Sequence, residues 1–133
     1  MNREELSALV RAYIEYFDSV TVSPDGNVTP TRDNSSTSWA VDKMVDITHD
    51  NPDLLWDVVL EFLKHDPSPQ AVAVIAAGPV EDCLAYRGEE VIERVEHLAA
   101  TNEKFRHMLG GVWKNAMSEA VWKRVQACRG EVW

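Results

Sequence analysis

The chain contains few of the features that mark secreted or membrane proteins. Its only two cysteines, Cys83 and Cys128, fall on apolar faces of expected helices, where a reduced cysteine packs as a small hydrophobic residue. It has no run of about 20 apolar residues that could cross a bilayer. Its first residues lack the continuous apolar run and the cleavage site of a signal peptide. We therefore expect a cytoplasmic protein that makes no contact with a membrane.

Basic residues are scarce in the middle of the chain. Residues 33–100 carry 14 acidic and 4 basic side chains, a net charge of −10, whereas residues 101–133 carry 3 acidic and 6 basic ones, a net charge of +3. Nucleic-acid binding needs a clustered basic surface, so we expect no direct contact with nucleic acid. The expected partner of such a chain is a basic protein, or else a cation.

The composition is that of a folded protein, and its periodicity is helical. A length of 133 residues fits one domain, and the hydrophobic share of 45% is enough to form a core. Apolar residues recur at i, i+3, i+4 and i+7, most clearly from Leu6 to Phe17, where Asn2 and Glu5 form a capping-box signature. We predict a single all-α domain over residues 1–133, a compact bundle of about seven or eight short helices.

One long connection has no helical pattern. Residues 19–34 are rich in turn-forming residues, with Pro24, Asp25 and Gly26 between two short runs of threonine and valine. This composition predicts a loop or a small hairpin. A connection of this length is uncommon in compact domains and is often functional.

Local signals mark the boundaries of the later helices. The expected starts are Asn51 with Pro52, Asp66 with Pro67, and Ser118, and the expected stops are Gly78, Gly88 and Gly130. Residues 71–77 are apolar on every side and fit a buried helix or a short buried strand, of which we favour the helix because its neighbours are helical. The repeated cap-plus-proline starts suggest stacked helical hairpins, as in a solenoid.

Four segments carry a resemblance to a known family: WAVDKMVDI (39–47), NPDLLWDVVLEFL (51–63), AAGPVEDCL (76–84) and GGVWKNAMSEAVWKRV (110–125). They resemble a bacterial family of uncharacterised small proteins, catalogued as the domain of unknown function DUF6869. The likeness spans residues 39–129 and leaves out the first helix and the loop after it. It implies a bacterial origin and a helical fold, and it assigns no catalytic residue.

Two acidic stripes form the most specific charged pattern. With i, i+4, i+8 spacing, each stripe lines one face of a helix; the first is Asp42, Asp46 and Asp50, and the second is Asp53, Asp57 and Glu61. If these faces lie side by side, the six carboxylates repel one another unless a cation or a basic partner neutralises them. The alternative is a solvated surface that keeps the domain soluble.

A tryptophan lies beside the second stripe. Trp56 falls toward the polar edge of its helix, where it is either an anchor of a binding interface or a residue that packs on the adjacent helix. Interface anchors are rich in tryptophan and are surrounded by polar rims.

Metal binding and catalysis have less support. Asp46, His49 and Asp50 have the spacing of a small metal site, but no second histidine accompanies them at ligand spacing, so we expect no cofactor. The sequence also lacks a glycine-rich phosphate loop and a nucleophile motif, and we assign no catalytic residue.

Charge and fold class together favour a non-enzymatic protein-binding module, in the manner of an immunity or antitoxin-like protein that masks a basic partner. Two alternatives stay open. One is a carboxylate-rich metal-binding protein or hydrolase, and the other is a helical adaptor that forms a homodimer through its tryptophans.

Overall fold

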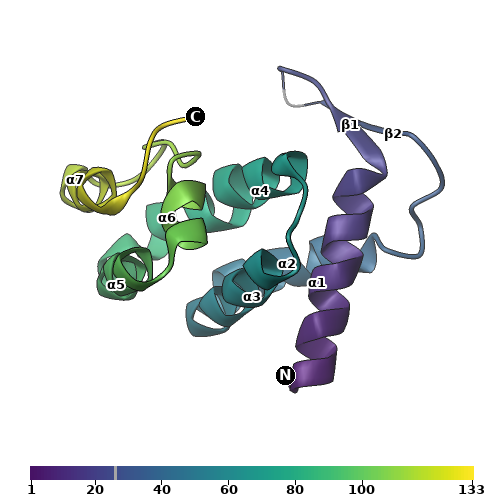
Figure 1. Cartoon of the computed structure of the whole chain (residues 1–133), viewed down its shortest axis with the longest axis horizontal. Coiled ribbons are helices and arrows are strands. Elements are labelled where there is room, and N and C mark those ends of the chain that lie inside the picture. Colours follow the sequence, from purple (N-terminus) through teal and green to yellow (C-terminus); the bar gives the residue numbers. More distant parts are fainter. Residues whose placement is uncertain (26) are drawn as a thin grey trace.

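The computed structural model describes residues 1–25 and 27–133, and most of these residues are helical (Figure 1). The helices are α1 Arg3–Asp18, α2 Trp39–Asp50, α3 Pro52–Lys64, α4 Pro69–Ile75, the π-helix η1 Ala76–Val80, α5 Glu81–Thr101, α6 Glu103–Leu109 and α7 Glu119–Cys128. Two short strands, β1 Val20–Val22 and β2 Val28–Pro30, lie between α1 and α2. The predicted all-α class is confirmed, and no described helix is both long and apolar enough to span a bilayer.

Three helices begin where the sequence predicts. Asn2 and Glu5 form the capping box of α1, the side chain of Asn51 accepts a hydrogen bond from the Leu54 amide, and Ser118 caps α7. In each case the side-chain oxygen satisfies an amide that has no partner within its helix.

The predicted cap at Asp66 is wrong. Asp66 has a φ of 47° and pairs with Lys104 at 2.7 Å, and it starts no helix. The cap is Ser68, whose hydroxyl accepts from the Ala71 amide and donates to Asp18 of α1 at 2.7 Å. Ser68 and Pro69 repeat the cap-plus-proline signature two residues later, and the bond to α1 favours the later start.

The predicted helix stops at Gly78 and Gly88 are also wrong. α4, η1 and α5 follow one another without a break, so the described chain has six continuous helical segments, fewer than the seven or eight expected. Pro79 cannot donate a backbone hydrogen bond, and the π-helical turn accommodates it without ending the helix. Residues 71–77 are accordingly helical, as we favoured.

Gly88 does not end its helix but allows another helix to pack closely against it. The helix bends at Arg87, whose φ and ψ are −133° and 23°. A Cβ on Gly88 would lie 2.9 Å from both γ-methyl groups of Val121, so the glycine allows α7 to lie close against α5. α7 ends at Cys128, close to the predicted stop at Gly130, but Arg129 is extended and Gly130 is not left-handed, so a left-handed glycine does not form the cap.

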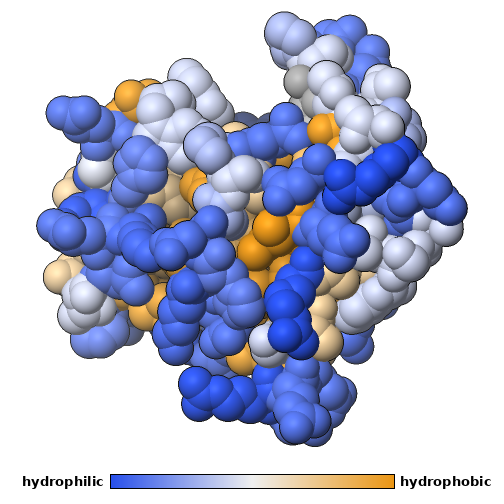
Figure 2. Space-filling view, turned by 45° about the vertical axis from the view of Figure 1, so that its right-hand side comes forward, coloured by the Kyte–Doolittle hydropathy of each residue, from blue (hydrophilic) through white to orange (hydrophobic). Residues whose placement is uncertain are grey.

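The helices pack around one another without forming a row of hairpins. α1 lies against α2, α3 and α4 on one side of the molecule, whereas α5 contacts α6 and α7 on the other (Figure 1). This arrangement gives no support to a solenoid-like stack. Hydrophilic residues cover most of the face drawn in Figure 2, and hydrophobic residues show between them, most clearly near the middle.

The segment 19–34 contains a hairpin that is held against the helices. β1 and β2 pair antiparallel with Val20 opposite Pro30. The side-chain amide of Gln70 donates to the carbonyls of Phe17 and Val20 at 2.6 and 2.9 Å, which ties the base of the hairpin to α4. Of the predicted turn, Gly26 lies outside the described residues.

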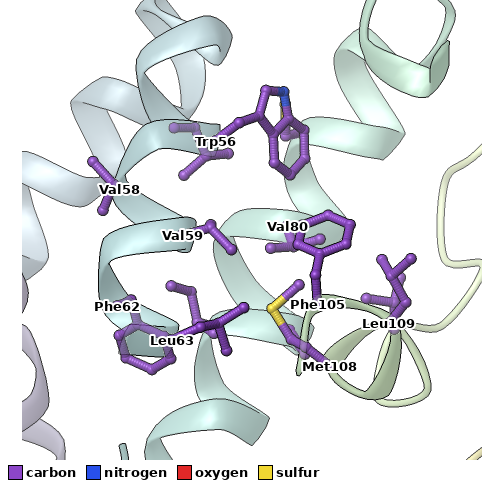
Figure 3. Packing of buried hydrophobic residues seen from close by; sticks show 14 of the residues in the cluster. Trp56, Val58, Val59, Phe62, Leu63, Val80, Phe105, Met108 and Leu109 are labelled. Carbon is purple, nitrogen blue, oxygen red and sulfur yellow. The ribbon is translucent and has the colours of Figure 1, made fainter. Parts of the chain in front are cut away.

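The core contains the largest aromatic side chains. Trp56 of α3 is fully buried and packs edge to face on Phe105 of α6, with ring centroids 6.2 Å apart (Figure 3). Trp56 is therefore not a surface anchor, and that interpretation of the sequence is wrong. Its position on α3 turns toward α6, which the polar neighbours along the sequence do not indicate. Cys83 is buried and Cys128 is half-buried, and both are free.

Candidate functional site

The second acidic stripe finds its partners inside the molecule. Arg94 of α5 reaches across to α3, where its Nη2 lies 3.0 Å from Asp57 Oδ1 and its Nη1 lies 3.7 Å from Asp53 Oδ1. Glu61 lies 3.2 Å from the ring of His65. These carboxylates face α5 and the end of α3, so part of their charge is balanced without a partner protein. No signal in the sequence pairs Arg94 with residues so far away along the chain.

The first acidic stripe differs in this respect. Asp42, Asp46 and Asp50 are exposed, and none of them takes part in an ion pair formed by the described residues. α2 buries its opposite side, which carries Ala40, Met44, Ile47 and Thr48. The stripe is therefore the part of the acidic pattern that is free to meet a partner.

Exposed apolar side chains lie on the same face of α2. Trp39 and Val45 are 46% and 51% exposed, and Tyr86 of α5, which is 72% exposed, has its ring 6.0 Å from the ring of His49. Val45 lies at the edge of the apolar side of α2 and faces outward. We call the following set the α2 surface: Trp39, Asp42, Val45, Asp46, His49, Asp50 and Tyr86.

Arg87 joins the two helices that form this surface. Its Nη2 donates to the carbonyl of His49 at 3.0 Å, near the C-terminus of α2, where a positive charge is favoured by the helix dipole. Its Nη1 lies 3.3 Å from Glu90 on α5. The contact fixes the last turn of α2 against the bend in α5 and so places His49 beside Tyr86.

A hollow opens beside the α2 surface, between α2 and η1. Its volume is about 190 Å³. Its apolar lining includes Val41, Val45 and Pro79, and its polar lining includes Tyr13, His49 and Asp82. Val45 and His49 thus belong both to the hollow and to the α2 surface.

The metal hypothesis is not supported by the geometry. In the part of the chain that the structure describes, no three histidine, cysteine, aspartate or glutamate side chains gather closely enough to hold a metal ion. Asp46, His49 and Asp50 share a helix face, but the imidazole of His49 lies near Tyr86. Spacing along one helix puts side chains on the same face without making their donor atoms converge.

Fold and surface together define an all-helical protein with one acidic and apolar face on α2. The chain belongs to the family of unknown function DUF6869, whose family model matches residues 27–132. The match includes all seven residues of the α2 surface and leaves out α1. No curated protein and no solved structure matches the chain.

Proposed function

We propose that this protein is a non-enzymatic binding module whose α2 surface binds a basic protein. The observation that carries the proposal is the combination on one helix face of three carboxylates without internal ion pairs and two exposed apolar side chains, Trp39 and Val45. Protein interfaces commonly place aromatic anchors inside a polar rim, because the rim shields the buried contacts from water.

Charge complementarity decides the chemistry of the partner. The net charge of −10 over residues 33–100 gives this half of the molecule a field that attracts a positively charged protein. Such attraction mainly increases the association rate, and salt weakens it. A partner with lysine or arginine around an apolar patch would relieve the repulsion among Asp42, Asp46 and Asp50.

The same chemistry argues against self-association through this face. In a symmetric dimer the same residues meet across the axis. Trp39 and Val45 would then bring Asp42, Asp46 and Asp50 of two copies together, and like charges at an interface are unfavourable. We therefore favour a basic partner over a homodimer. In this way the protein would mask a basic partner, as an immunity or antitoxin-like protein does.

The test compares two charge variants of the full chain. One changes Asp42, Asp46 and Asp50 to asparagine. The matched control removes the same number of charges from the second stripe by changing Asp53 and Asp57 to asparagine and Glu61 to glutamine, since these residues already have partners in Arg94 and His65. Each variant and the wild type capture proteins from a bacterial lysate, and the captured protein is identified by mass spectrometry. Its binding kinetics are then measured by surface plasmon resonance at low and high salt.

We expect the wild type and the control to bind the same basic protein. The α2 variant should associate about tenfold more slowly at low salt and show a flatter salt dependence, because steering acts on the on-rate. Equal kinetics for all three proteins at low salt would contradict the proposal and leave the first stripe as a solvated surface.

A further inference from the structure

The π-helical turn η1 contributes Gly78 and Pro79 to the lining of the hollow beside α2. Gly78 in this turn lines the hollow, and nothing lies within 4 Å of the point where its Cβ would be. The walls come from Val41 and Val45 on one side and from Val74 and Pro79 on the other. π-helical turns are rare and are often found at functional sites. These apolar side chains thus form walls of the hollow, and Gly78 has no side chain that would fill it.

A largely buried tyrosine lines this space. Tyr13 of α1 is 2% exposed, and its ring packs against Phe17 and Phe62 at 4.9 and 6.2 Å between centroids. Its hydroxyl forms no hydrogen bond with any residue in the described part of the chain. Among the described residues, the fully buried side-chain atoms without a partner are Asn34 Nδ2 and Trp56 Nε1, so the Tyr13 hydroxyl is open to the hollow, where it can bond to water or to a group that enters. Burial raises the pKa of Tyr13, and the group therefore remains a neutral phenol that can accept a hydrogen bond.

Two further acceptors line the hollow. The Thr48 hydroxyl donates to the Met44 carbonyl at 2.7 Å, which leaves the lone pairs of its oxygen free. Asp82, which is half-buried, supplies a carboxylate. The lining residues include no lysine and no arginine. The hollow therefore favours a group that donates hydrogen bonds and carries a positive charge.

The apolar walls and the volume of the hollow indicate which kind of side chain can enter it. About 190 Å³ holds roughly six groups of the size of a water molecule, at ~30 Å³ each. A lysine side chain has four methylene groups, which suit the apolar walls, and an ammonium group with three donors. The planar guanidinium of arginine is larger and less compact.

We propose that the hollow between α2 and η1 receives a lysine side chain of the basic partner. The methylene groups pack between Val45 and Pro79, and the ammonium reaches the oxygens of Tyr13, Thr48 and Asp82. This inference rests on the proposed function, because the α2 surface brings the partner to the hollow. It adds a specific anchor to a surface that otherwise selects its partner by charge.

The first experiment uses a small probe and needs no partner. Nα-acetyl-lysine N-methylamide is titrated into the full chain and followed by ¹H–¹⁵N NMR, beside the norleucine analogue, which has the methylene groups and no ammonium. We expect the lysine probe to shift the amide resonances of Gly78 and Val45 with a Kd on the order of millimolar, as for a small ligand with few contacts. The norleucine analogue should bind at least about tenfold more weakly, since one hydrogen bond to a charged group is worth about that much. Equal binding of the two probes would overturn the inference.

Three variants test the named groups. Gly78→Leu fills the hollow, and we expect it to abolish binding of the lysine probe. Tyr13→Phe and Asp82→Asn each remove one acceptor and should weaken binding about tenfold. Asp53→Asn is the matched control, because it removes the same charge from α3, outside the hollow, and should leave the affinity unchanged. If Gly78→Leu does not fold by circular dichroism, Tyr13→Phe decides the question, since it removes a single oxygen that makes no internal bond. Unchanged affinity in Tyr13→Phe and Asp82→Asn would contradict the inference.

The source of the ammonium group and the proposed function are tested separately. Putrescine, a free diamine, is titrated in the same way, and binding about tenfold tighter than that of the lysine probe would overturn the assignment to a protein side chain. Partner binding that needs the α2 carboxylates but is unaffected by Gly78→Leu would overturn the inference alone. Partner binding that is unaffected by the α2 charge variant would overturn the proposed function, whatever the probe shows.

Discussion

The indole ring of Trp133 stacks on the imidazole of His107, with ring centroids 5.3 Å apart and planes inclined by 16°. The indole Nε1 also donates to the carbonyl of His107 at 2.6 Å. Gly110 and Gly111 form the surface beneath the ring, and a Cβ on Gly111 would lie 2.7 Å from it. The segment after α7 therefore covers the C-terminal end of α6, and these two glycines allow its close approach.

We predict that Trp133→Ala lowers the free energy of unfolding by about 1–3 kcal/mol, because it removes a partly buried aromatic ring and its hydrogen bond. Urea denaturation measures the change. Trp113→Ala is the control, since that side chain is 61% exposed and should contribute a few tenths of a kcal/mol at most. Equal losses in the two variants would contradict the packing role of Trp133.

Glu81 should hold the connection between α6 and α7 in place. Its buried carboxylate accepts hydrogen bonds from the Trp113 amide at 2.8 Å and from Asn115 Nδ2 at 3.2 Å, and Asn115 has a φ of 44°. We predict that Glu81→Ala costs about 1–3 kcal/mol, because it leaves a backbone amide without its partner. Glu81→Gln, which keeps one acceptor, should cost less. Hydrogen exchange at the Trp113 amide is the local measurement, and unchanged protection in Glu81→Ala would show that this amide is held by another contact.

Gln70 should stabilise the base of the hairpin. We predict that Gln70→Ala lowers the free energy of unfolding by about 1–2 kcal/mol, because two carbonyls, of Phe17 and Val20, lose their donor. Replacing residues 21–30 by a short linker should lower the free energy of unfolding less than replacing residues 19–34. Only the longer replacement removes the buried Ser19 and Val20. Equal melting temperatures for the two replacements would show that Ser19 and Val20 contribute nothing to stability.

The ion pair between Glu96 and Arg124 should make stability depend on pH. Arg124 Nε lies 3.0 Å from Glu96 Oε2 and joins α7 to α5, and this hydrogen bond lowers the pKa of Glu96 below its ordinary value of 4.5. Because the folded-state pKa is lowered, the contribution is present above about pH 4.5 and is lost as the pH falls through the folded pKa. We predict that Glu96→Gln is less stable than the wild type at pH 7 and equal to it at strongly acidic pH. Urea denaturation at both pH values measures this, and a difference that persists in acid would contradict it.

Much of the helical structure follows from local sequence. The capping box of Asn2 and Glu5, the cap of Asn51 and the cap of Ser118 each depend on residues within one helical turn, so the sequence predicts them correctly. The same local rules are wrong at Asp66, because Ser68 forms a hydrogen bond to Asp18, far away along the chain.

The sequence likewise predicts only part of the candidate site. The spacing of Asp42, Asp46 and Asp50 along the sequence is enough to place them on one face of α2, because a helix repeats every 3.6 residues. Only the tertiary structure shows that Arg94 pairs with Asp53 and Asp57 of the neighbouring stripe and that Trp56 is buried, because both facts depend on contacts between separate helices. The hollow also depends on such contacts, since the residues that line it come from α1, α2, α4, η1 and α5. Helix caps and hydrophobic periodicity depend on residues that are close together in the sequence, so the sequence alone is enough to predict them. Contacts between side chains of different helices depend on how the whole core packs, and only the tertiary structure shows this.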